Sequence, residues 1–146
     1  MNVADMMTAS PVVIQPDKSL KDALDTMEEV GCHHLPVISD GHLVGIITDH
    51  DCRIALHAPK IPPQTGTFEE AAGKITVRQL MTPAPIVVEP DASADEACRL
   101  MLAHHVSSLP VMNSETLVGI ITTSDILMAF IRMHQREGSL REKAFR

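Results

Sequence analysis

An internal repeat constrains the fold of this 146-residue chain more than any other feature of its sequence. The sequence LVGIIT occurs at residues 43–48 and again at residues 117–122, and the shorter Leu-Pro-Val occurs at residues 35–37 and again at residues 109–111. Roughly 20 of about 54 positions aligned at this spacing are identical, which indicates duplication of one structural unit. We expect the first copy, the linker, the second copy and the tail at residues 1–56, 57–76, 77–137 and 138–146.

Within each copy, the order of sequence patterns predicts the elements βαββα. Short apolar runs at residues 12–14 and 86–88 each follow a proline and predict buried strands. Helix-start signals at Ser19 and Ser93 precede apolar residues at helical spacing. The buried helix faces are expected to hold Leu20, Ala23, Leu24, Met27 and Val30 in the first copy, and Ala94, Ala97, Met101 and Leu102 in the second.

Two strands and a second helix complete each copy. Asp40-Gly41 between apolar runs predicts a tight hairpin, and residues 113–116 predict a looser turn at the same place in the second copy. One copy has too few elements to bury a core alone. We therefore expect an α+β fold in which two βαββα repeats stack sheet to sheet about a pseudo-twofold axis. The Pro- and Gly-rich linker is expected on the surface, and the polar tail is expected to be frayed.

Composition excludes several classes of function. The net charge of −7 disfavours a protein that binds nucleic acid or anionic membranes through its general surface. No apolar run reaches the ~20 residues that a membrane-spanning helix needs, so no membrane insertion is expected. Cys32, Cys52 and Cys98 are odd in number and lack metal-ligand spacing, which is typical of reduced thiols in a cytoplasmic protein.

The polar residues that recur in both copies are the threonine and aspartate of the pattern Gly-Ile-Ile-Thr-x-x-Asp. They are Thr48 and Asp51 in the first copy and Thr122 and Asp125 in the second. Free backbone N–H groups at a helix start attract anions, and an aspartate there can accept hydrogen bonds from a ribose diol. The alternative is that the threonine and aspartate only cap the helix.

The ordered combination of Met-Thr-x-x-Pro, Leu-Pro-Val and Gly-Ile-Ile-Thr-x-x-Asp resembles the cystathionine β-synthase (CBS) domain, and the duplication resembles a CBS-domain pair. The resemblance covers residues 3–56 and 77–130. It implies paired βαββα units that bind AMP, ADP, ATP or S-adenosylmethionine in two clefts between the repeats, and it implies pairs that often dimerise.

The resemblance also implies the ligand-binding residues of each cleft. The cleft of Asp51 is expected to contain Ile46, Thr48, His50 and Asp51 with the borrowed residues Thr82, Ile86, Val106 and Ser107. The cleft of Asp125 is expected to contain Ile120, Thr122, Ser124 and Asp125 with the borrowed residues Thr8, Val12, Cys32 and His33. Near the phosphate, the first copy carries His33, His34, His50 and Arg53 where the second carries Ser107, Ser108, Ser124 and Leu127. We therefore expect unequal clefts.

These observations predict a non-catalytic regulatory module that senses an adenosine-containing small molecule, needs no cofactor and acts on an unidentified protein. We expect a homodimer that buries the apolar face of the helix at residues 124–136. One alternative is a constitutive dimerisation or scaffold module with vestigial clefts. A metal- or thiol-dependent enzyme rests only on the eight histidines and three cysteines, and we expect no metal site because no histidine recurs at aligned positions.

Overall fold

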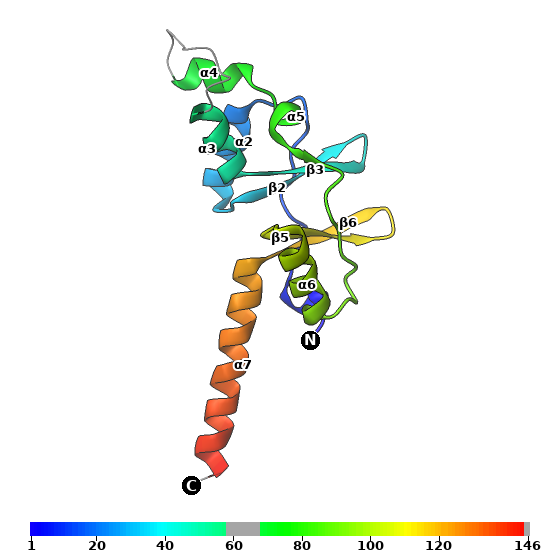
Figure 1. The fold of residues 1–146 in the computed structure, drawn as a ribbon, viewed down its shortest axis with the longest axis vertical. Coiled ribbons are helices and arrows are strands. Elements are labelled where there is room, and N and C mark those ends of the chain that lie inside the picture. The colour runs from blue at the N-terminus through cyan, green and yellow to red at the C-terminus, as the bar shows by residue number, and fades with distance from the viewer. Residues whose placement is uncertain (58–67, 145–146) are drawn as a thin grey trace. The chain divides into compact units, whose positions relative to one another are not determined.

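The structure, a computed structural model, describes residues 1–57 and 68–144 (Figure 1). It divides into two compact units of mixed α and β structure, which confirms the predicted α+β class. The first unit comprises residues 11–85, and the second comprises residues 1–10 together with residues 86–146. The predicted boundaries at 1–56 and 77–137 describe the duplicated sequence and stay a prediction, whereas these units describe packing.

The described residues of the first unit form a three-stranded antiparallel sheet in the order β2-β3-β4, with four helices. In chain order its elements are α2 (Leu20–Val30), β2 (His34–Ser39), β3 (His42–Thr48), α3 (Asp49–His57), α4 (Phe68–Lys74), α5 (Val77–Leu80) and β4 (Thr82–Pro83).

The second unit has an equivalent three-stranded sheet in the order β1-β6-β5, and no equivalent of α4 occurs among its described residues. Its elements are α1 (Val3–Met6), β1 (Thr8–Ala9), α6 (Ala94–His104), β5 (Ser108–Asn113), β6 (Thr116–Thr122) and α7 (Thr123–Ala144). The central strand of each sheet, β3 or β6, ends directly at the helix that carries the recurring aspartate.

The strands expected at residues 12–14 and 86–88 are each reduced to one parallel bridge, Ile14 with Val37 and Val88 with Val111. The Ile14 N–H donates to the Pro36 carbonyl, and the Ile14 carbonyl accepts from the Ile38 N–H. The next donor along this ladder would be Pro16, which has no N–H, so pairing stops there. Short strands β4 and β1 provide the third strand of each sheet instead.

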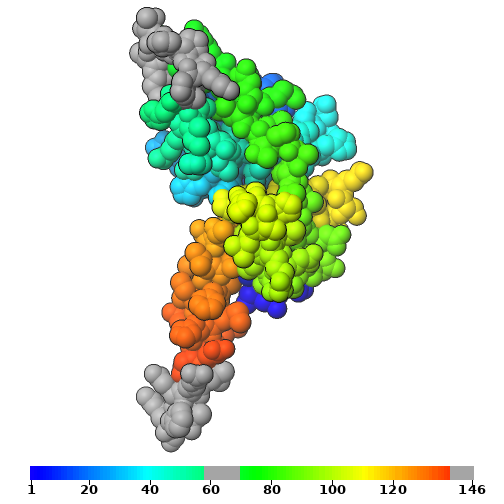
Figure 2. Space-filling view, in the orientation of Figure 1, coloured from blue at the N-terminus to red at the C-terminus, as the bar shows by residue number. Residues whose placement is uncertain are grey.

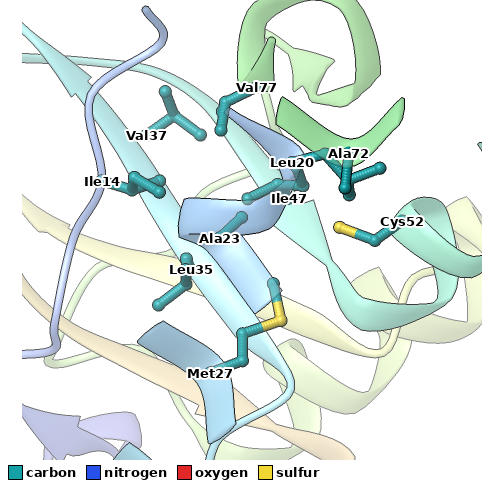
Figure 3. Close-up of a cluster of buried hydrophobic side chains, with 10 residues drawn as sticks. All are labelled: Ile14, Leu20, Ala23, Met27, Leu35, Val37, Ile47, Cys52, Ala72 and Val77. Atoms are coloured by element: carbon teal, nitrogen blue, oxygen red, sulfur yellow. The ribbon is translucent and has the colours of Figure 1, made fainter. Parts of the chain in front are cut away.

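Each unit has its own core. In the first unit, buried side chains of α2, β2, β3, α3 and α4 meet on one face of the sheet (Figure 3). The equivalent cluster of the second unit contains Val3, Val88, Ala97, Met101, Leu109, Val111 and Ile121. Two helix residues predicted to be buried are exposed, Val30 at 49% and Leu102 at 77%. Val30 is the last residue of α2, and Leu102 lies about 100° around α6 from Met101.

Both hairpins are tight two-residue turns. Asp40 and Gly41 have φ angles of 50° and 79°, as a primed turn requires. In the second copy β5 ends at Asn113 and β6 begins at Thr116, so the looser turn expected there is wrong. The left-handed φ of 56° at Ser114 gives this turn its reversal without a glycine.

Two boundary expectations also differ from the structure. Within the expected surface linker, residues 58–67 lie outside the described residues, but residues 68–74 form α4, whose Ala71 and Ala72 are buried in the first unit. Good helix formers between the linker prolines and Gly73 account for this helix. The tail, which was expected to be frayed, is helical from residue 138 to Ala144, where it forms the end of α7.

Candidate functional site

A pair of reciprocal hydrogen bonds fixes the turn from β3 into α3. The Thr48 N–H donates to Oδ2 of Asp51 at 3.1 Å, and the Asp51 N–H donates to Oγ1 of Thr48 at 3.1 Å. This is a capping box, in which the two residues satisfy backbone donors that a helix start otherwise leaves free. The predicted helix-capping role of this threonine and aspartate is therefore present in the first unit.

The turn from β6 into α7 has the same geometry. The Thr122 N–H donates to Oδ2 of Asp125 at 2.9 Å, and the Asp125 N–H donates to Oγ1 of Thr122 at 3.3 Å. The Thr122 hydroxyl also lies 3.1 Å from the same Oδ2. In the described part of the chain, Oδ1 of Asp51 and of Asp125 accepts no hydrogen bond, and both aspartates are half-buried. Each carboxylate therefore keeps one oxygen for a ligand while the other caps the helix.

Short strand pairing brings a second threonine to each turn. Thr82 of β4 pairs with Ile46 of β3, and Thr8 of β1 pairs with Ile120 of β6. Side chains at paired positions, and at positions two apart in a strand, point to the same face of a sheet. Thr82 and Ile46 therefore share the face of Thr48, as the predicted site of Asp51 requires, and Thr8, Ile120 and Thr122 do the same.

His50 and Ser124 occupy equivalent exposed positions between the threonine and the aspartate of each turn. The other borrowed residues belong to the opposite packing unit from the aspartate they were assigned to. For Asp51 these are Ile86, Val106 and Ser107, and for Asp125 they are Val12, Cys32 and His33. Their assignment to the two clefts stays a prediction.

A cluster of charged side chains flanks the first turn and has no counterpart at the second. Nδ1 of His33 lies 3.0 Å from Oδ2 of Asp49, and Nη2 of Arg53 lies 3.9 Å from the same oxygen. The equivalent residues of the second unit are Ser107, Thr123 and Leu127. Sequence reasoning found His33 and Arg53 but missed Asp49, although its (i, i+4) spacing to Arg53 on one helix predicts an ion pair.

Asp49 changes what the cluster can offer a phosphate, because it already contacts the side chains of His33 and Arg53. These two side chains are 74% and 73% exposed, so their contacts with Asp49 are weak and a phosphate can compete for them. The cluster lines a groove of about 660 Å³ along α2 and α3, whereas Thr48 and Asp51 do not.

The thiols of the first unit are held in their neutral form. Burial, followed by the nearby carboxylates of Asp51 and Asp49, raises the pKa of the Cys52 thiol to about 12. Burial also raises the pKa of Cys32. Since the thiolate is the reactive species, these two residues lack the environment of a nucleophile. Among the described residues, no group of three or more His, Cys, Asp and Glu side chains is placed to hold a metal ion.

Comparison with known proteins then identifies the family. The family model for the CBS domain matches residues 3–58 and again residues 77–132. The chain belongs to the CBS domain family. A CBS domain-containing protein of Dictyostelium discoideum is 34% identical over 133 residues, which cover 90% of this chain and 92% of that protein.

Two solved structures of CBS proteins are similar to this chain and carry ligands. The structure of CBSX2 in complex with AMP has a TM-score of 0.72 and 33% identity, and the match covers 91% of this chain and 98% of that one. The CBS domain pair of protein MJ0100, in complex with 5′-methylthioadenosine and S-adenosylmethionine, has a TM-score of 0.76 and 27% identity over 89% of this chain and 95% of that one.

The CBS match also shows how sequence and packing units differ. Each matched segment begins near residue 3 or residue 77, so it includes the short helix and strand that precede a repeat. In the structure, residues 1–10 pack in the unit of the second repeat, and residues 75–84 pack in the unit of the first. The two Thr-x-x-Asp turns are therefore completed by the segment that precedes the other repeat in sequence.

Proposed function

We propose that this CBS-domain pair is a regulatory module that binds an adenosine compound, namely AMP, ADP, ATP or S-adenosylmethionine, at its two Thr-x-x-Asp turns. One observation carries the proposal. In both turns the capping bond uses Oδ2 of the aspartate, so Oδ1 of Asp51 and of Asp125 stays available beside a threonine and an isoleucine. The ligands of CBSX2 and of the MJ0100 pair, which are all adenosine compounds, support the same chemistry.

Each turn supplies the groups that such a ligand needs. An aspartate Oδ1 can accept a hydrogen bond from a ribose hydroxyl, worth roughly 1.5–3 kcal/mol when the acceptor is charged. Ile46 and Ile120 are 8% and 6% exposed and offer an aliphatic surface to the base. The chain has no Trp or Tyr and no Phe among the proposed site residues, so in this proposal aliphatic side chains hold the adenine.

In this proposal, His50 and Ser124 stand beside the phosphate or its equivalent. Thr82 and Thr8 contribute at the turns to which strand pairing brings them.

We further propose that the module is a homodimer in the cytoplasm. Helix α7 exposes Leu127 and Phe130 by 62% and 66%, with Ile131 and His134 continuing the same stripe at helical spacing. Figure 2 shows the surface of α7 (orange) uncovered on the viewed face. A second copy that covers this stripe would remove it from water. Within the described residues no helix is long and apolar enough to cross a bilayer.

A ligand screen on the dimer tests this function. AMP, ADP, ATP and S-adenosylmethionine are added separately to ligand-stripped protein, and the melting temperature and the molar mass are measured. A ligand at 100 times its Kd stabilises the folded state by about 2.7 kcal/mol, which raises the melting temperature measurably. No stabilisation by any of the four, with a dimer that persists, would favour a constitutive scaffold instead.

A further inference from the structure

Two equivalent segments dock onto the two units in the same way. We call residues 1–10 the first docking segment and residues 75–84 the second docking segment. Each contains a one-turn helix with a fully buried valine, Val3 or Val77, followed by a two-residue strand. In Figure 2 the first docking segment (blue) lies against the yellow-green surface of the second unit, as its hydrogen bonds to residues 90–94 require.

The backbone hydrogen bonds of the two docking segments match one for one. In the second unit, Val3 N–H donates to the Ala92 carbonyl at 2.8 Å and Ala4 N–H donates to the Pro90 carbonyl at 2.9 Å. In the first unit, the equivalent bonds from Val77 and Arg78 to Lys18 and Pro16 have the same lengths. The contacts of the two segments are therefore comparable in kind and number.

The attachment of the two segments to their units differs. The second docking segment follows α4 directly, and the first unit is continuous from residue 11 to residue 85. The first docking segment packs in the second unit, but residue 11 already belongs to the first unit, and the second unit resumes only at residue 86. The first docking segment is joined to residues 86–146 of its unit through residues 11–85, which form the other unit, so its docking contacts must offset the closure of this long connection.

Backbone strain is present at the residue where the first docking segment ends. Ser10 has a φ angle of 48° and precedes Pro11, and the equivalent Ala84 has a φ angle of 45° and precedes Pro85. A residue with a side chain is disfavoured at positive φ, and a following proline restricts it further. Undocking of residues 1–10 would relieve this strain at Ser10, which favours local opening over complete closure.

The first docking segment also brings Thr8 to the turn of Asp125. Thr8 pairs with Ile120, two residues before Thr122, on the face that the proposed ligand occupies. A ligand that contacts Thr8 binds the docked state more tightly than the undocked state. Linkage then requires that the ligand favour docking by the same factor by which docking favours the ligand.

We propose that the first docking segment is a latch, which opens and closes locally on the second unit and which an adenosine ligand at the Thr122–Asp125 turn holds closed. The coupling to the ligand rests on the proposed function, whereas local opening does not. The latch is the part of the second unit whose docking reports whether this turn is occupied.

Hydrogen exchange of the full chain, followed by mass spectrometry with and without AMP, tests the latch. In the ligand-free protein, the amides of residues 3–10 should exchange faster than those of the β5–β6 hairpin. Val3→Ala should accelerate exchange in residues 3–10 about tenfold, through lost burial, and leave the hairpin unchanged. AMP should slow exchange in residues 3–10 about fivefold or more.

Val77→Ala is the matched control, because Val77 is equally buried in the second docking segment. It should accelerate exchange across the first unit, α4 included, since that segment is continuous with its unit. If Val3→Ala does not fold, Asp5→Ala weakens the same segment at an exposed position, where the Asn2 N–H donates to Oδ2 of Asp5 at 2.8 Å.

The outcomes separate the latch from the proposed function. Equal acceleration of residues 3–10 and of the hairpin by Val3→Ala would overturn the latch. AMP binding by calorimetry without slower exchange in residues 3–10 would overturn the coupling and leave the proposed function standing. Failure of AMP and the other adenosine compounds to bind the wild-type protein would overturn the proposed function and the coupling, while ligand-free exchange would still decide local opening.

Discussion

Replacement of Gly45 by alanine places a methyl group against the segment that completes the first sheet. A Cβ atom at Gly45 would lie 2.6 Å from Sδ and 3.0 Å from Cγ of Met81, and 2.9 Å from the carbonyl oxygen of Thr82. The Met81 side chain can move, but the Thr82 backbone cannot move without loss of the pairing between Thr82 and Ile46. Overpacking of this kind costs about 1–3 kcal/mol. We expect Gly45→Ala to lower the free energy of unfolding by about 2 kcal/mol.

Urea denaturation of three variants measures this effect and divides it between its causes. Gly73→Ala is the control, because a Cβ there meets nothing within 4 Å and the residue lies in α4. It should raise the free energy of unfolding by about 0.5–1 kcal/mol, through helix propensity. Gly45→Ala combined with Met81→Ala should show a favourable coupling energy, because it removes the two side-chain contacts and keeps only the contact with the Thr82 carbonyl.

The reasoning would be refuted if Gly45→Ala were as stable as the wild-type protein. The segment at residues 75–84 would then be able to shift away from β3 at no cost. The conclusion that close packing of methionine on glycine holds β4 in place would fail with it.

Three further predictions follow from single side chains. Ser19→Ala removes the hydroxyl that accepts from the Asp22 N–H at 3.0 Å and should cost about 1 kcal/mol of stability. Burial raises the pKa of Cys52 to about 12, so the thiol of the unfolded state loses its proton first as pH rises. The stability that this thiol contributes should therefore be complete below about pH 8.5 and should fall above that pH. Cys52→Ala should remove this pH dependence of the free energy of unfolding, as measured by urea titration. Arg53→Leu introduces the residue that the second unit has at the equivalent position, Leu127. It should weaken AMP binding at the Asp51 turn more than it weakens adenosine binding, because the Arg53 guanidinium carries a permanent positive charge. An equal effect on both ligands would show that Arg53 does not reach the phosphate.

The duplication made much of the fold predictable. A repeat spacing of 74 residues carried each interpretation from one copy to the other, and the strands and helices around Leu35-Pro36-Val37 and Leu109-Pro110-Val111 form as the patterns indicate. Local chemistry was sufficient at these places, because turn residues and helix caps act within a few positions of the chain.

The missed features depend on contacts between distant residues. Nothing local shows that residues 1–10 pack in the unit of residues 86–146, because this placement depends on contacts with residues 90–94 and 118–120. The strands predicted at residues 12–14 and 86–88 are longer than the single bridges observed at Ile14 and Val88. The apolar pattern was given more weight than the proline two residues after each bridge, which has no N–H to donate. The exposed Leu102 shows that apolar character alone does not place a residue on the buried face.

The candidate site was predictable in its recurring residues and not in its electrostatics. Thr48 and Asp51 stand out because they recur in both copies, and the structure gives them the capping geometry that sequence reasoning raised as the alternative. The structure adds that capping uses only Oδ2, so capping and ligand binding do not compete for one oxygen. The pairing of Asp49 with His33 depends on the approach of residue 33 to the helix start, which the sequence does not reveal.

Calorimetry with AMP on Asp51→Asn and Asp125→Asn tests the central claim most directly. Asparagine keeps an oxygen for the capping bond and loses the charge that a ribose hydroxyl would meet. Asp22→Asn is the matched control, because Asp22 forms the same capping box with Ser19 at the start of α2. We predict that each of the first two variants weakens AMP binding about tenfold or more at its own turn, that the double variant weakens it at both, and that Asp22→Asn leaves it unchanged. Wild-type affinity in the double variant would contradict the account.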